Sequence, residues 1–115
     1  MTPNEYQQKA LHYKAMSDFK VDGSTIMLLE GVMGAAGESG EALELVKKHI
    51  FQGHSLDRQH VAKELGDATW YIALASDALG FTLEDILQMN IEKISGRYPD
   101  GYDDDRSIYR NPEDV

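Results

Sequence analysis

Apolar residues recur along this chain at intervals of three and four, the spacing that places them on one face of a helix. The pattern divides the chain into four successive helical segments. The third segment shows it most clearly, at Val61, Leu65, Ala68, Ile72, Ala75 and Leu79. The fourth repeats it at Leu83, Ile86, Leu87, Ile91 and Ile94. No stretch shows the strict alternation of a strand, so the pattern predicts an all-α protein.

Two of the four segments begin with a capping box, in which a hydroxyl side chain and an acid three residues later satisfy each other's backbone N–H groups. Residues Thr2 to Glu5 have this pattern, with proline at the first helical position, and predict a helix to about Ser17. Residues Thr82 to Asp85 form a weaker version and predict a helix that ends before Pro99.

The two middle segments have less obvious boundaries. Ser24 or Thr25 is expected to cap the second helix, which ends near Phe51. The third helix follows Ser55 and ends at Gly80, a residue suited to the position after a helix.

Four glycines recur every third residue inside the second segment, at Gly31, Gly34, Gly37 and Gly40. Each glycine costs a helix about 0.5–1 kcal/mol relative to alanine, so their presence needs a reason. The spacing favours a close crossing of two helices that only small residues permit. A local break or bend of the helix near the neighbouring acids is the alternative.

Composition limits the class of protein. A length of 115 residues fits one domain, and the absence of cysteine excludes disulfides and thiolate metal sites. The N-terminus lacks the apolar core of a signal peptide, and no stretch is long enough to span a membrane. We therefore expect a soluble, cytoplasmic protein with a helical domain over residues 1–99. Residues 100–115 are expected to form an acidic, mostly irregular tail that Tyr102, Ile108 and Tyr109 could dock.

The formal net charge of −9, with no visible basic patch, argues against direct binding to duplex nucleic acid. It says little against nucleotides, because a divalent metal can mediate between acidic side chains and phosphates.

Two pairs of acids, each three residues apart, lie on consecutive predicted helices: Glu38 with Glu41, and Glu64 with Asp67. Three residues make nearly one helical turn, so each pair shares a face. Converging carboxylates repel each other unless a cation neutralises them, and hard oxygen ligands suit Mg²⁺ or Mn²⁺. Solvated helix faces also carry such pairs, and the spacing alone leaves both interpretations open. The glycine inside each pair favours the metal, because glycine lets a ligand or another backbone come close.

The spacing argues against a rival metal chemistry. Carboxylate-bridged di-iron bundles use Glu-x-x-His on paired helices. No glutamate here has a histidine three residues later, and the four histidines are scattered without ligand spacing.

A stripe of hydrogen-bond donors lies on the last predicted helix, at Asn90, Lys93 and Arg97, with Tyr98 next. It is typical of a phosphate clamp, in which lysine supplies a point charge and arginine a planar fork. Favourable interaction of Lys93 and Arg97 with the C-terminal end of their helix is the structural alternative.

Three motifs in this order resemble the MazG-like nucleotide pyrophosphohydrolases of the all-α NTP pyrophosphatase superfamily, over roughly Leu28 to Tyr98. They are Glu38-Ser-Gly-Glu41, then Glu64-Leu-Gly-Asp67 followed by Ala-Thr-Trp-Tyr, and Asn90-x-x-Lys93-x-x-x-Arg97-Tyr98-Pro99. Some relatives carry a further acid immediately before the first glutamate. Gly37 stands there in this chain, which leaves the general base unassigned.

The resemblance implies a four-helix-bundle-like domain that assembles as a homodimer or a dimer of dimers. It implies hydrolysis of a nucleoside triphosphate to the monophosphate and pyrophosphate, with a role in cleansing the nucleotide pool. A related substrate such as dUTP, dCTP or phosphoribosyl-ATP, and a non-catalytic oligomerisation or regulatory module, remain alternatives.

The same resemblance assigns roles to individual residues. Mg²⁺, with Mn²⁺ as a substitute, would be bound by Glu38, Glu41, Glu64 and Asp67. Catalytic roles would fall to Glu38, Glu41, Lys93 and Arg97. The substrate would contact Asn90, Lys93, Arg97, Tyr98, Trp70 and Tyr71. Trp70 could stack on the base, although its position in a helix favours a place in the core.

Overall fold

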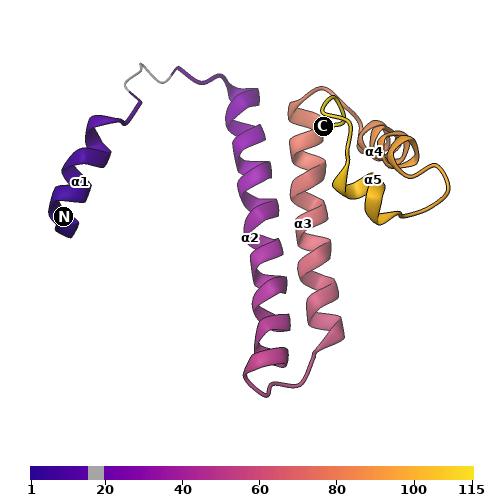
Figure 1. Cartoon of the computed structure of the whole chain (residues 1–115), viewed down its shortest axis with the longest axis horizontal. Helices are drawn as coiled ribbons and strands as arrows, with labels where there is room; N and C mark the ends of the chain where they lie inside the picture. Colours follow the sequence, from indigo (N-terminus) through magenta and orange to yellow (C-terminus); the bar gives the residue numbers. More distant parts are fainter. Residues whose placement is uncertain (16–19) are drawn as a thin grey trace.

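The computed structural model describes residues 1–15 and 20–115 and contains, over those residues, five helices and no strand (Figure 1). The prediction of an all-α protein is confirmed. The helices are α1 (Pro3–His12), α2 (Gly23–Phe51), α3 (Arg58–Ala78), α4 (Leu83–Arg97) and α5 (Asp104–Ile108).

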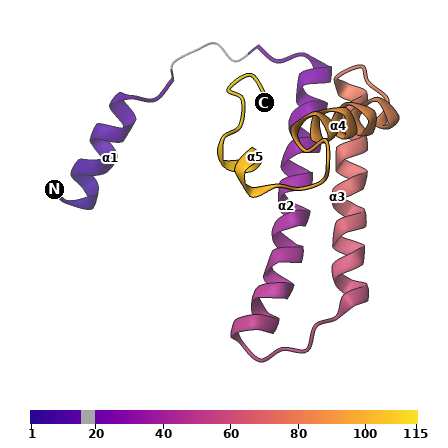
Figure 2. The ribbon, with the colours of Figure 1, turned by 45° about the vertical axis from the view of Figure 1, so that its right-hand side comes forward.

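Helices α2 and α3 lie side by side as a long antiparallel hairpin, which is the main packing contact of the chain (Figures 1 and 2). Glycines permit this close approach. A Cβ on Gly31 would lie 2.8 Å from the Cβ of Ala75, and one on Gly34 would overlap the ring of Tyr71. The predicted close crossing is therefore confirmed at these two positions. Helix α2 runs unbroken to Phe51, so the alternative of a local break is wrong.

Gly37 and Gly40 have a different environment from the first two glycines. A Cβ at either position would meet nothing within 4 Å, and the same is true of Gly66 on α3. Packing within the chain therefore does not require these three glycines.

Both predicted capping boxes are present. The side chain of Thr2 accepts a hydrogen bond from the backbone N–H of Glu5, and the side chain of Thr82 accepts one from that of Asp85. In return, each carboxylate accepts a hydrogen bond from the backbone N–H of the corresponding threonine. Helix α1 ends at His12, earlier than predicted; the predicted end, Ser17, lies outside the described residues.

Aspartates cap the two middle helices, and at the second helix Asp22 takes the place of the predicted Ser24 or Thr25. The carboxylate of Asp22 accepts from the Thr25 N–H at 2.8 Å, and that of Asp57 from the His60 N–H at 3.0 Å. A carboxylate at this position also interacts favourably with the positive end of the helix dipole. Helix α2 thus starts at Gly23 and α3 at Arg58.

Helix α4 crosses the hairpin near the C-terminal end of α3 and packs on α3, while α1 stands apart (Figure 2). Among the described residues, the hairpin is the main helical packing, so the single chain does not form the expected four-helix bundle. The radius of gyration of 19.6 Å also exceeds the roughly 13 Å of a compact domain of this length.

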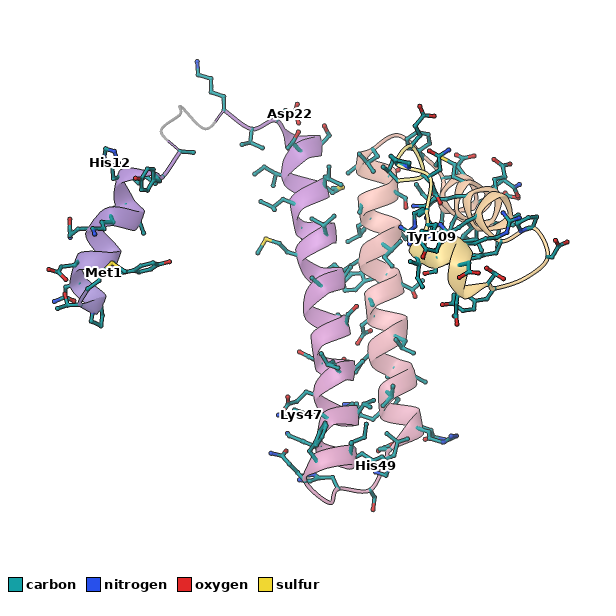
Figure 3. The ribbon with its side chains drawn as sticks, in the orientation of Figure 1. Met1, His12, Asp22, Lys47, His49 and Tyr109 are labelled. Atoms are coloured by element: carbon teal, nitrogen blue, oxygen red, sulfur yellow. The ribbon has the colours of Figure 1, made fainter. Side chains whose placement is uncertain are left out.

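Much apolar surface is left uncovered. Among the described residues, the buried apolar side chains are those of Ala42 and Ala68 alone. Along the side of α2 that faces away from α3, side chains project with nothing packed against them (Figure 3). We call five of the exposed apolar residues of α2 the α2 stripe: Ile26, Leu29, Met33, Leu43 and Ile50. No helix within the described parts of the chain is long and apolar enough to cross a membrane.

Beyond α4 the chain turns at Gly101, whose positive φ of 95° suits glycine, and returns along α4 as a segment that contains α5. The three side chains expected to dock this segment, Tyr102, Ile108 and Tyr109, are 70–80% exposed. The Tyr102 ring nevertheless contacts the ring of Tyr98, their centres 5.2 Å apart. An ion pair between Asp114 and Arg97 also docks the segment.

Candidate active site

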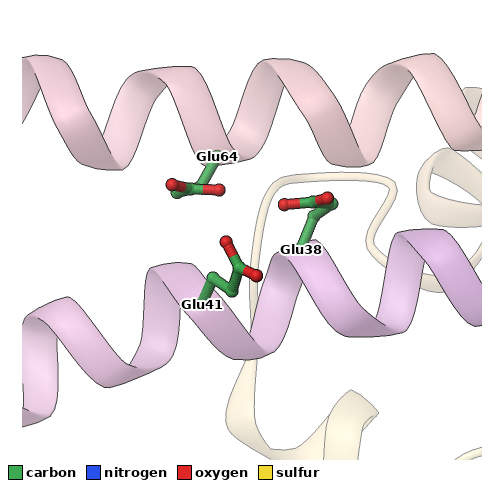
Figure 4. Close-up of side chains that lie close together, drawn as sticks. All are labelled: Glu38, Glu41 and Glu64. Atoms are coloured by element: carbon green, nitrogen blue, oxygen red, sulfur yellow. The ribbon is translucent and has the colours of Figure 1, made fainter.

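Three of the four candidate metal ligands converge between α2 and α3. Carboxylate oxygens of Glu38, Glu41 and Glu64 all lie within 4.8 Å of one another, and the three side chains point toward one another (Figure 4). The first two come from consecutive turns of α2, and the third comes from the facing side of α3. Glu64 is buried, Glu38 is half-buried and Glu41 is exposed, so one edge of the cluster is open to solvent.

The electrostatics of the cluster show mutual repulsion. The pKa of Glu38 is raised, first by a hydrogen-bonding contact with the Glu64 carboxyl group and then by partial burial. The charges of Glu41 and Asp67 raise this pKa further. Asp67 is exposed and lies outside the group of three, yet it is close enough to act on Glu38. A bound cation would relieve this repulsion.

The donor set fits a hard divalent cation. It consists of carboxylate oxygens alone, the ligands that Mg²⁺ prefers, and Mg²⁺ binds oxygen at roughly 2.0–2.1 Å. Two oxygens on opposite sides of such an ion are about 4.2 Å apart by the same geometry. Oxygens already within 4.8 Å of one another therefore need only small side-chain movements to bind one ion.

A histidine that sequence reasoning missed contacts this cluster. Nε2 of His60, one turn before Glu64 on α3, lies 2.9 Å from Oε1 of that residue. The search for Glu-x-x-His could not find this residue, because the histidine precedes the glutamate by four positions. A search of both directions at i and i+4 would have found it. The imidazole is placed to orient the Glu64 carboxylate.

The predicted phosphate clamp lies on a different part of the chain. Lys93 and Arg97 line a cavity between α4 and the C-terminal segment that includes none of the four acids. Arg97 is bound by Asp114, and its guanidinium also lies 5.9 Å from the centre of the Tyr98 ring. Asn90 is exposed on α4. The single chain thus does not bring the clamp and the acids together.

The two aromatic residues after the second acid pair have different environments. The Tyr71 ring packs over Gly34 in the α2–α3 interface. Trp70 is 59% exposed, so the interpretation of Trp70 as a core residue is wrong for the single chain. The two rings are in contact with each other, their centres 4.8 Å apart.

Comparison with known proteins identifies relatives of the region that carries these residues. The family model of the MazG nucleotide pyrophosphohydrolase domain matches residues 30–102. The "Gene 37 protein" of Mycobacterium phage L5 is 33% identical over 69 residues, which cover 56% of this chain and 60% of that protein. The match therefore spans less than two thirds of this relative's length. No solved structure matches the chain.

Proposed function

Because the chain belongs to the MazG nucleotide pyrophosphohydrolase family, we propose that it hydrolyses a nucleoside triphosphate to the nucleoside monophosphate and pyrophosphate with the help of Mg²⁺. The convergence of Glu38, Glu41 and Glu64 carries this proposal. A scaffold has no use for repelling carboxylates between two packed helices, whereas a metal-dependent hydrolase needs them.

In this proposal Glu38, Glu41, Glu64 and Asp67 hold the metal. When bound, the metal supplies Lewis-acid charge at a phosphoryl oxygen and lowers the pKa of a bound water. A carboxylate that the metal would not fully engage would accept the proton of the attacking water. His60 keeps the Glu64 carboxylate oriented throughout.

Lys93 and Arg97 bind the phosphate groups. Their positive charges stabilise the charge that develops on pyrophosphate as it leaves. Arginine suits this role because its planar fork donates two parallel hydrogen bonds to phosphate oxygens.

Assembly of two or more copies completes the proposed enzyme. The α2 stripe supports this, because a row of large apolar side chains in water is typical of an interface. The contact between α2 and α3 leaves these side chains exposed. Association also offers a way to bring the α4 of one chain to the carboxylates of another, since the single chain keeps them apart.

A pyrophosphate-release assay tests the reaction, the substrate and the metal together. The panel of substrates contains NTPs and dNTPs, including dUTP and dCTP, and also phosphoribosyl-ATP. Glu41→Gln and Asp67→Asn should lose most of the turnover. Two matched controls, Glu30→Gln on α2 and Asp77→Asn on α3, remove the same charge from exposed positions on the same helices and should retain it. If no nucleotide is hydrolysed with Mg²⁺ or Mn²⁺, or the two pairs of variants behave alike, the proposed function is wrong.

A further inference from the structure

The C-terminal segment binds the basic side of α4 through one well-formed ion pair. The Asp114 carboxylate accepts hydrogen bonds from Nε of Arg97 at 2.6 Å and from Nη2 at 2.8 Å. The two side chains are only 20% and 14% exposed. A partly shielded, bidentate arginine–carboxylate pair is stronger than an ordinary surface ion pair. Arg97, a candidate phosphate ligand, therefore already holds an anion that belongs to its own chain.

The ion pair lies at a cavity of about 480 Å³ between α4 and the C-terminal segment, large enough for a nucleotide's phosphate chain. Four of the eleven basic residues of this acidic chain line the cavity. They are Lys93, Arg97, Arg106 and Arg110. Three acids, Glu92, Glu113 and Asp114, also line it. Positive charge is thus in excess here, although the whole chain carries a net charge of −9.

Arg106 and Arg110 come from the C-terminal segment, beyond the residues 30–102 that the family model matches. They lie four positions apart, on and just after α5, and line the same cavity as Lys93. The pKa of Asp114 is lowered mainly by the hydrogen bonds from Arg97 and also by the charges of Arg110 and Lys93. Arg97, Arg110 and Lys93 therefore all stabilise a negative charge at the position of the Asp114 carboxylate.

We propose that this cavity binds the phosphate chain of the substrate, that Arg106 and Arg110 add to Lys93 and Arg97 there, and that Asp114 occupies Arg97 until phosphate displaces it. This inference rests on the proposed function. A phosphate group offers arginine the same pair of acceptor oxygens as a carboxylate. A triphosphate can interact with all four cations at once, whereas Asp114 binds Arg97 alone. We therefore expect bound triphosphate to displace Asp114 from Arg97.

Isothermal titration of the full chain with inorganic triphosphate, in the absence of divalent metal, tests the cavity directly. Asp114→Asn should bind triphosphate about tenfold more tightly than the unchanged chain, since it no longer competes for Arg97. Asp105→Asn removes the same charge from the same segment, outside the cavity, and should change binding less than twofold. The double variant Arg106→Ala/Arg110→Ala should bind about tenfold more weakly by the same scale, whereas Arg58→Ala should not.

Two results would overturn the inference: equal or weaker binding by Asp114→Asn, or unchanged binding by the double arginine variant. Circular dichroism of each variant checks that the helices remain folded. Pyrophosphate release from nucleotides is measured separately. If the chain shows the expected triphosphate binding but hydrolyses no nucleotide, the proposed function is wrong and this inference stands. If the chain hydrolyses nucleotides but the variants do not differ in triphosphate binding as expected, the proposed function stands and this inference is wrong.

Discussion

The ring of Tyr71 lies directly against the backbone of Gly34, where the Cβ of any other residue would overlap it. The contact involves the near end of the ring, which cannot move aside without displacing α3. The hairpin that carries the carboxylates therefore depends on a glycine at this position.

Gly34→Ala should accordingly destabilise the chain by about 1–3 kcal/mol, the usual cost of overpacking. Gly37→Ala is the matched control on the same helix, because a Cβ there meets nothing, and it should stabilise by about 0.5–1 kcal/mol. Urea unfolding at a fixed protein concentration measures both. Combining Gly34→Ala with Tyr71→Ala should recover part of the loss; changes that simply add would rule out the contact as the cause.

His60 is expected to matter for metal binding although it is not a ligand. His60→Ala should weaken Mg²⁺ or Mn²⁺ binding by about tenfold or more, because the Glu64 carboxylate loses the partner that orients it. Titration calorimetry with Mn²⁺ measures this. His54→Ala, in the loop between α2 and α3, should bind the metal as the unchanged chain does. Equal metal affinities for the unchanged chain and the two variants would show that His60 does not contribute to metal binding.

The ion pair between Asp114 and Arg97 has a defined pH dependence. The pKa of Asp114 in the folded chain is lowered from the ordinary aspartate value of 3.8. The pair therefore contributes its full stability above pH 3.8. This contribution is lost as the pH falls through the lower pKa of the folded chain. Carboxyl NMR should place the Asp114 midpoint below 3.8. In Arg97→Ala the midpoint should move upward, because the largest cause of the depression is gone. An unmoved midpoint would show that the pair does not form in solution.

The sequence predicted most of the secondary structure because the helix signals are local. The capping boxes at Thr2 and Thr82 and the stop at Gly80 each depend on residues three or four positions away. Asp22 was missed as a cap because Ser24 and Thr25 nearby offered equally good local signals, and no cap was predicted where Asp57 begins α3.

The arrangement of the site was harder to predict, because it depends on contacts between distant residues. Spacing placed Glu38 and Glu41 on one face of a helix, but only the packing of α2 on α3 brings Glu64 to them. The contact between Arg97 and Asp114 joins residues 17 positions apart and leaves no periodic pattern in the sequence.

The α2 stripe predicts how the chain associates. Leu43, which is 68% exposed in the single chain, should become buried when two copies meet. Leu43→Glu would place a charge in that interface and should shift the chain toward monomer in sedimentation velocity at micromolar concentration. Gln59→Glu adds the same charge at an exposed position on α3 and should leave the assembly intact. A chain that is monomeric before any substitution would contradict the proposed assembly.

If assembly joins the α4 of one chain to the carboxylates of another, two inactive variants should restore each other. Glu41→Gln disables the acids and keeps Arg97, whereas Arg97→Ala disables the clamp and keeps the acids. Mixed oligomers, formed by co-expression with different tags, would then contain some sites built from one intact α4 and one intact hairpin. Pyrophosphate release by the mixture should exceed that of either variant alone several-fold, up to about a quarter of the unchanged activity if each site takes one half from each of two randomly paired chains. A mixture with no more activity than its components would place the acids and the clamp of each working site in the same chain, and α4 would then have to move toward the hairpin on binding substrate.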